Sequence, residues 1–73
     1  MIEPAPQETV TDLATLALPW GKEMRVQQVV YDGGLRLLRL RIREGRRFTV
    51  LDLDARAVDR LRTLTEGWTN VAP

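Results

Sequence analysis

The chain contains no cysteine and no histidine among its 73 residues. Without cysteine it can form neither disulfides nor iron–sulfur clusters, and it cannot build a thiolate zinc site. Without histidine it lacks both the commonest metal ligand and the commonest general base. We therefore expect a protein that is not an enzyme, with no catalytic residues, no metal site and no cofactor.

Long apolar runs are also missing. No stretch approaches the roughly 18 apolar residues that a membrane span requires. The chain starts Met1-Ile2-Glu3-Pro4, without the basic residues and apolar segment of a signal peptide. These two absences predict a cytoplasmic protein that does not enter a membrane.

The chain is short enough to be one domain. A chain of this size buries only about 60% of its unfolded surface, so small domains are commonly stabilised by disulfides, metals or oligomerisation. Since the first two are not expected, oligomerisation remains. Residues 1–8 contain two prolines and no periodicity, and we expect them to form a disordered tail. We place a single domain at residues 9–68 and a second tail at residues 69–73.

The positive charge is carried almost entirely by arginine, since Lys22 is the only lysine among eleven cationic residues. Codon usage in a GC-rich genome is a sufficient explanation for this preference. The distribution is uneven, however, because six arginines fall between residues 36 and 47. Nucleic-acid-binding domains usually have a pI above ~9, and the sequence pI of about 8.3 is lower. The overall charge thus argues against such a role, but the local cluster of arginines keeps polyanion binding open.

Three tripeptides that end in glycine divide the middle of the chain. They are Pro19-Trp20-Gly21, Asp32-Gly33-Gly34 and Arg43-Glu44-Gly45. Each fits a three-residue hairpin loop, whose last position requires a positive φ that glycine adopts without strain. Three such loops would pair Leu18 with Lys22, Tyr31 with Leu35 and Ile42 with Arg46. All even-numbered strand residues would then lie on one sheet face.

The even-numbered face is mostly apolar, and a helix follows it. Arg36 would lie opposite Asp52 there and form a cross-strand ion pair. Asp54 is a good N-cap, and Gly67 can end the helix. Apolar residues recur at helical spacing between them at Ala57, Val58, Leu61, Leu64 and Trp68. The pattern predicts an α+β fold (ββββα), in which a three- or four-stranded antiparallel meander is packed against one C-terminal helix that covers the even-numbered face.

The segment 9–18 fits two structures. Its apolar residues match a helix that begins at Thr9, but they also match a strand paired with residues 22–26. The sequence favours the strand only slightly.

One end of the odd-numbered face is apolar. Exposed apolar surface of a few hundred Å² usually marks an interface. The alternative is that the N-terminal segment folds back over it. We expect an interface formed by Val29, Tyr31, Leu35, Leu37, Leu51 and Leu53.

The other end of the odd-numbered face is basic. Its arginines could simply be solvated, or they could hold a polyanion, with Tyr31 or Trp20 available to stack on bases. For Trp20 we expect packing against the domain rather than exposure. The predicted polyanion site consists of Arg25, Arg39, Arg41 and Arg47.

Three segments resemble a short, uncharacterised bacterial domain family of unknown function. They are Leu18-Pro19-Trp20-Gly21, Asp32-Gly33-Gly34-Leu35 and residues 37–49, and the resemblance spans residues 15–68. It implies no activity. At the level of topology, four meandering strands followed by one helix are similar to the PC4-like coactivator fold, which implies dimerisation and single-stranded DNA binding on the sheet. The lysine-rich contacts of that fold have no match in this chain, so no DNA-binding residue is carried over.

The function is therefore predicted only as a class. We expect a small non-catalytic protein-binding or assembly module, as a homodimer or as an accessory subunit of a larger protein. The alternative is a binder of single-stranded nucleic acid or another polyanion through the arginine-rich sheet face.

Overall fold

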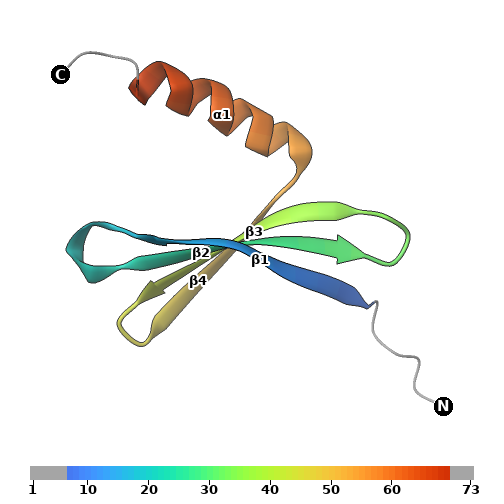
Figure 1. Cartoon of the computed structure of the whole chain (residues 1–73), viewed down its shortest axis with the longest axis horizontal. Coiled ribbons are helices and arrows are strands. Elements are labelled where there is room, and N and C mark those ends of the chain that lie inside the picture. The colour runs from blue at the N-terminus through green and yellow to red at the C-terminus, as the bar shows by residue number, and fades with distance from the viewer. Residues whose placement is uncertain (1–6, 70–73) are drawn as a thin grey trace.

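The computed structural model describes residues 7–69. It shows a four-stranded antiparallel sheet in the order β1-β2-β3-β4, followed by one C-terminal helix (Figure 1). The predicted ββββα order is confirmed. The elements are β1 (Glu8–Ala17), a short 3₁₀ turn η1 (Pro19–Gly21), β2 (Glu23–Tyr31), β3 (Arg36–Glu44), β4 (Arg47–Leu53) and α1 (Ala55–Thr69).

The ambiguous N-terminal segment is a strand. β1 begins at Glu8, within the segment predicted to be a tail, and pairs with β2 over its whole length. The register shifts between Asp12 and Ala14, where β1 carries one extra residue. Such a bulge bends a strand and increases its twist, so β1 curls over the sheet. Residues 1–6 and 70–73, the remainder of the two predicted tails, lie outside the described residues.

The first two turns have the predicted pairing. The Leu18 amide donates to the Lys22 carbonyl at 2.8 Å, and the Tyr31 amide donates to the Leu35 carbonyl at 2.8 Å. β2 and β3 then stay in step along their length, so partners in these two strands share parity.

The third turn differs from the prediction. Glu44 pairs with Arg47, so the loop contains only Gly45 and Arg46, and the predicted pairing of Ile42 with Arg46 is wrong. Gly45 has a φ of 63°, which suits the first position of a two-residue hairpin loop. Because the loop is one residue shorter, the parity of β4 is inverted. Odd-numbered residues of β4 share a face with even-numbered residues of β3.

The two faces of the sheet therefore differ from the predicted map. We call the side bearing Leu38 and Leu40 the leucine face and the opposite side the arginine face. The apolar residues of the leucine face are Ala14, Leu16, Met24, Val26, Val30, Leu38, Leu40, Ile42, Leu51 and Leu53. The arginine face bears Arg25, Val29, Leu37, Arg39, Arg41, Arg43, Phe48 and Asp52.

Helix α1 begins as predicted. The carboxylate of Asp54 accepts a hydrogen bond from the Ala57 amide at 2.8 Å, which caps the first turn. Gly67 does not end the helix, which continues to Thr69. Without a positive φ, Gly67 supplies no left-handed stop.

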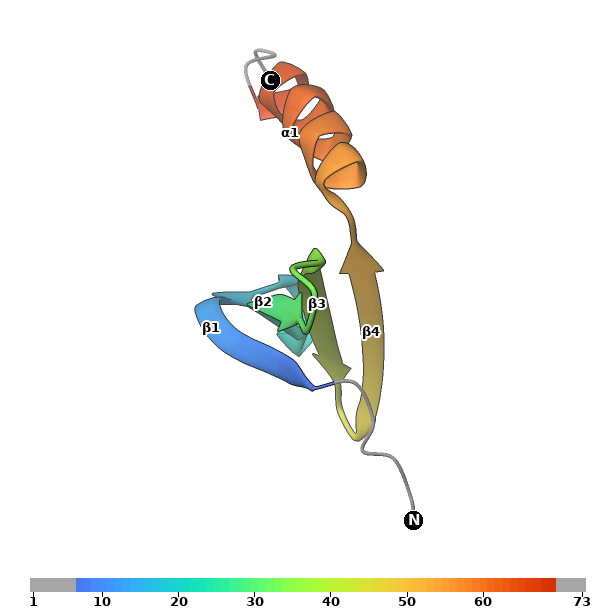
Figure 2. The same ribbon diagram turned by 90° about the vertical axis from the view of Figure 1, so that its right-hand side faces the viewer.

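The predicted cover over the sheet is not formed. Figure 2 shows α1 standing off from the strands, and no residue of Ala55–Thr69 is buried. The start of the helix lies nearest the sheet, mainly at β3 and β4, because it follows directly after Leu53 and Asp54. Its stripe stays open, with Leu64 52% and Trp68 77% exposed.

The buried core is correspondingly small. Among residues 7–69, Val29 is the only fully buried side chain, and the amide of Gln27 is nearly so. Both lie on the arginine face, beneath the curled half of β1. The Cα radius of gyration is 15.3 Å, against about 11 Å for a compact domain of this length. One copy of the chain leaves its apolar surfaces largely uncovered.

Candidate functional site

The leucine face is a continuous apolar surface across all four strands. Leu16, Met24 and Ile42 form one cross-strand row, and Val26, Leu40 and Leu51 form the next. Leu16 and Leu51 are more than two-fifths exposed, and the others are half-buried. The leucines project side by side from neighbouring strands and form one apolar surface.

A hollow of about 280 Å³ separates this face from the start of α1. Leu38 and Leu53 form its sheet wall, and Val58 and Arg62 form its helix wall. The helix therefore leaves the sheet on the leucine side and opens a wedge instead of closing onto the strands (Figure 2).

On the inner half of the arginine face, around Arg39, the charged side chains pair with one another. The guanidinium of Arg39 donates to both carboxylate oxygens of Asp52, at 2.8 and 3.1 Å, and to Glu8 at 3.2 Å. A longer contact of 3.4 Å reaches the Tyr31 hydroxyl. The hydrogen bonds from Arg39 lower the pKa of Asp52, and those to Asp52 and Glu8 raise the pKa of Arg39. The predicted ion pair of Asp52 with Arg36 is replaced by this network, since the shorter turn moves Asp52 opposite Arg39.

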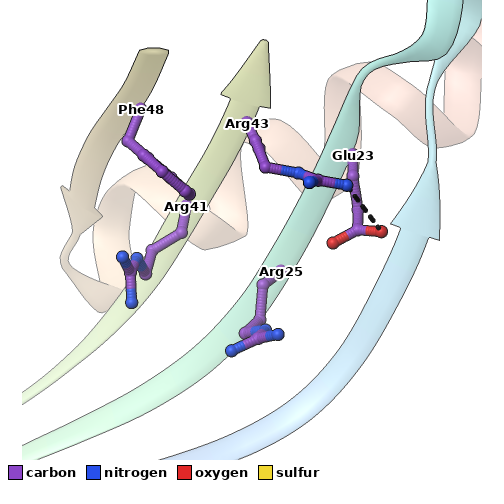
Figure 3. A pocket seen from close by; sticks show the side chains of 5 residues that line it. All are labelled: Glu23, Arg25, Arg41, Arg43 and Phe48. Atoms are coloured by element: carbon purple, nitrogen blue, oxygen red, sulfur yellow. Dashed lines mark ion pairs between the residues drawn. The ribbon is translucent and has the colours of Figure 1, made fainter. Parts of the chain in front are cut away.

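The outer half of the arginine face is different. Arg25 lies directly opposite Arg41, and Arg43 follows in the next row beside Phe48. Their side chains line a hollow of about 360 Å³ together with Glu23 (Figure 3). Glu23 is 3.8 Å from Arg43, and the Arg41 guanidinium lies 5.4 Å from the centre of the Phe48 ring. Three cations and one carboxylate leave this hollow with an excess of positive charge.

The six predicted interface residues are divided between the two faces. Val29 is fully buried within its own chain, and Tyr31 and Leu37 are half-buried beside it, while Leu35 remains exposed. They share the arginine face, whose apolar end is partly covered by the curled N-terminal half of β1. The other two, Leu51 and Leu53, lie on the leucine face, because the third turn inverts the parity of β4.

The four predicted polyanion-binding residues are also divided. Arg25 and Arg41 are neighbours on the arginine face. Arg39 is occupied by two carboxylates, and Arg47 lies on the leucine side, opposite Glu44. The sequence analysis missed Arg43 and Phe48 as members of the cluster.

A signal for the correct register was present in the charges. The predicted three-residue loop places Arg41 opposite Arg47, which is a like-charge pair. The observed loop instead places Arg47 opposite Glu44 and Arg39 opposite Asp52. Opposite charges across strands are favourable and like charges are not, so cross-strand charge selects the shorter loop.

Trp20 is exposed instead of packed. Its side chain is 91% exposed, and its backbone is left-handed, with a φ of 62°. A positive φ is uncommon for a residue other than glycine, and such strain concentrates at functional sites. The turn leads directly into Glu23 and therefore lies at the same end of the sheet as the arginine cluster.

Neither a metal centre nor a membrane-spanning helix is found among residues 7–69. No group of three acidic side chains between residues 7 and 69 could hold a metal ion. The single helix described, α1, is neither long nor apolar enough to cross a membrane. The candidate sites are thus two surfaces, one apolar and one basic.

Comparison with known proteins identifies the family. The chain belongs to the Family of unknown function (DUF6967), whose model matches residues 7–71. No curated protein and no solved structure matches the chain.

Proposed function

We propose that this member of DUF6967 is a self-associating assembly module, in which α1 of one copy packs on the leucine face of a second copy and the second helix packs on the first. The observation that carries the proposal is the separation of α1 from its own sheet (Figure 2). Within residues 7–69, each chain presents an apolar helix stripe with no buried residue and an apolar sheet face that only the start of α1 approaches.

The exposed area supports an extensive contact. The chain exposes 6481 Å², whereas a compact protein of 8.3 kDa exposes about 4,600 Å². The excess of roughly 1,900 Å² is surface that one copy leaves uncovered, counted over the whole chain and not over residues 7–69 alone. A symmetric pair that buried most of this excess would exceed the ~2,000 Å² above which obligate dimers lie.

The dimensions of the two surfaces fit one another. A helix of the 15 residues of α1 is about 22 Å long. The nine residues of β3 extend for about 30 Å. The helix can thus lie along the leucine face and place Leu61, Leu64 and Trp68 on it.

A second copy explains both surfaces with one contact. Under two-fold symmetry, the helix of each copy meets the sheet of the other, so neither surface remains open. An unrelated partner would have to supply a helix and a sheet of its own to achieve the same cover. Because a hollow already separates α1 from its own strands, the two copies can exchange their helices without any further opening of the fold.

Three further properties remain predictions: bacterial origin, cytoplasmic location and a role as accessory subunit of a larger protein. Likeness to the PC4-like fold carries no part of the proposal.

Sedimentation equilibrium of the purified chain tests the proposal. We expect a mass of twice 8.3 kDa at micromolar concentrations. Leu64→Arg places a charge in the centre of the helix stripe, where burial without a partner is costly, and should shift the equilibrium to monomer. Thr63→Arg is the matched control, because Thr63 lies on the polar side of α1 and bonds only to the Asp59 carbonyl.

Two results would overturn the proposal. One is a monomer at ~100 μM, a concentration at which obligate dimers remain associated. The other is equal dimerisation of the Leu64→Arg and Thr63→Arg chains, which would place the contact elsewhere.

A further inference from the structure

We infer that the outer half of the arginine face is a binding site for single-stranded nucleic acid, in which Arg25, Arg41 and Arg43 hold phosphates and Phe48 stacks on a base. The site lies on the opposite side of the sheet from the leucine face. It does not depend on self-association.

The three arginines of the hollow have little compensating negative charge. Within residues 7–69, no carboxylate comes within 4 Å of Arg25 or Arg41, and the only one near Arg43 is Glu23 at 3.8 Å. Arg25 and Arg41 are direct cross-strand partners, and like charges in this position destabilise a sheet. An anionic ligand would relieve that repulsion.

Arg39, on the same face, differs from these arginines in having two carboxylate partners. Arg39 lies one row further in and is held by Asp52 and Glu8. On β4, Arg41 has Val50 opposite and Arg43 has Phe48 opposite, so neither meets a carboxylate of the kind that Asp52 offers Arg39. The only acidic partner in the cluster is Glu23 of β2, which lies opposite Arg43. The positive charge is therefore confined to one end of the face.

An aromatic ring, that of Phe48, lies within the arginine cluster. Phe48 is 57% exposed and forms one wall of the hollow, with the Arg41 guanidinium 5.4 Å from its ring centre (Figure 3). Phe48 is the one aromatic side chain among the residues that line this hollow. A base can stack on the ring while its phosphates meet the guanidiniums, which is how sequence-tolerant single-strand binders combine stacking and charge.

The shape of the site favours a single strand over a duplex. The hollow of about 360 Å³ lies within the size range of sites for small ligands, and it is open at the surface. A base inside a duplex is stacked on its neighbours and cannot lie on Phe48, whereas unpaired bases are free to stack on aromatic side chains. The site therefore takes about one nucleotide in the hollow, and the strand continues on either side.

Trp20 extends the same surface. It lies in the turn between β1 and β2, three residues before Glu23, which lines the hollow. Its exposure of 91% and its left-handed backbone hold an indole in solvent at this end of the sheet. It is available as a second stacking platform for the next base.

Fluorescence anisotropy with a labelled 12-nucleotide oligothymidine tests this inference. We expect binding in the micromolar range at ~50 mM salt, and a slope of log K against log salt near −2 from three phosphate contacts. Arg41→Gln should weaken binding several-fold and make the slope less steep by about 0.7. Phe48→Ala should weaken binding roughly 5- to 150-fold and leave the slope unchanged, because stacking involves no counterion release.

The controls separate this site from general attraction of anions. Arg60→Gln removes a positive charge from exposed α1 and should leave affinity unchanged. A duplex of the same length should bind more weakly than the single strand. Circular dichroism confirms that each variant is folded, and sedimentation of the same samples shows whether self-association is retained.

Three outcomes would overturn the inference. The first is no change in anisotropy at ~50 mM salt, where phosphate contacts are strongest. The second is binding that is unaffected by Arg41→Gln. The third is binding that is insensitive to Phe48→Ala, or equal affinity for the duplex, either of which would show a basic patch that makes no contact with bases.

Discussion

The two faces of the sheet are built from the same strands, but within one copy they differ in how far their side chains are buried and paired. The inner half of the arginine face has a buried valine and an arginine shared between two carboxylates. The leucine face carries more apolar side chains, yet it buries none of them fully. Hydrophobic composition alone therefore does not identify the core of this chain. The curl of β1 covers the inner half of the arginine face, whereas within residues 7–69 only the start of α1 approaches the leucine face.

This difference separates what one copy can stabilise from what needs another molecule. The pairing of β1 with β2, the pairing of β2 with β3 and the Arg39 network depend only on contacts within the chain. The leucine face and the α1 stripe depend on a second copy in our proposal. Substitutions on the two faces should consequently produce different defects, unfolding on one side and dissociation on the other.

The largest effect is expected at Val29. Val29→Asp places a carboxylate at the only fully buried side chain of residues 7–69, beside an Arg39 that already binds two carboxylates. An unpaired buried charge costs several kcal/mol, a large part of the stability of so small a domain. We expect loss of the far-ultraviolet circular dichroism of the folded chain. Leu35→Asp, on the same face but exposed, should remain folded, and equal damage from both variants would contradict a core centred on Val29.

A smaller effect, dependent on pH, is expected at Asp52. Arg39 lowers the pKa of Asp52 in the folded chain relative to the unfolded chain, where it is about 3.9. The pair therefore stabilises the fold fully above that value, and the contribution is lost as the pH falls through the lowered pKa of the folded state.

Asp52→Asn should cost about 1 kcal/mol at pH 7, since the pair is only partly shielded from water, and little once the wild-type carboxyl is protonated. Urea denaturation at pH 7 and at pH 2 measures the difference. Asp59→Asn is the control, because its pair with Arg62 is exposed on α1. A penalty for Asp52→Asn that stays constant with pH would show that the charge on Asp52 is not the source of the stabilisation.

The smallest effect compares two glycines. Gly67→Ala should stabilise α1 by roughly 0.5–1 kcal/mol, because Gly67 is inside a helix and an added Cβ meets no atom within 4 Å. Gly45→Ala should destabilise the chain by about 1 kcal/mol, since its φ of 63° is strained for alanine. Thermal denaturation should shift by a few degrees in opposite directions. Shifts of the same sign would contradict the assigned third turn or the continuity of the helix.

The sequence was sufficient for three strands, the helix and the first two turns, but it left residues 9–18 open between a strand and a helix. Gly21 and Gly34 each end a loop whose register the flanking strands repeat. The third turn was assigned incorrectly, because Gly45 fits either the last position of a three-residue loop or the first position of a two-residue loop. The residues of β4 could not decide between them, since apolar side chains alternate onto both faces: Phe48 and Val50 on one, Leu51 and Leu53 on the other.

The position of the helix was not predictable for another reason. The spacing of Leu61, Leu64 and Trp68 defines an apolar stripe and therefore predicts that the stripe will be buried. It contains no information about whether the covering sheet belongs to the same copy. The candidate sites changed with these two errors, because the register decides which arginines are neighbours and the helix decides which apolar face remains open.

The most direct test of the proposed exchange is an isotope-filtered NOE experiment on a mixture of labelled and unlabelled chains. The account predicts intermolecular NOEs from the Leu64 and Trp68 side chains of α1 to the Leu40 and Leu51 methyl groups of the leucine face. The same NOEs found only within one molecule, or no NOEs between these groups, would contradict it.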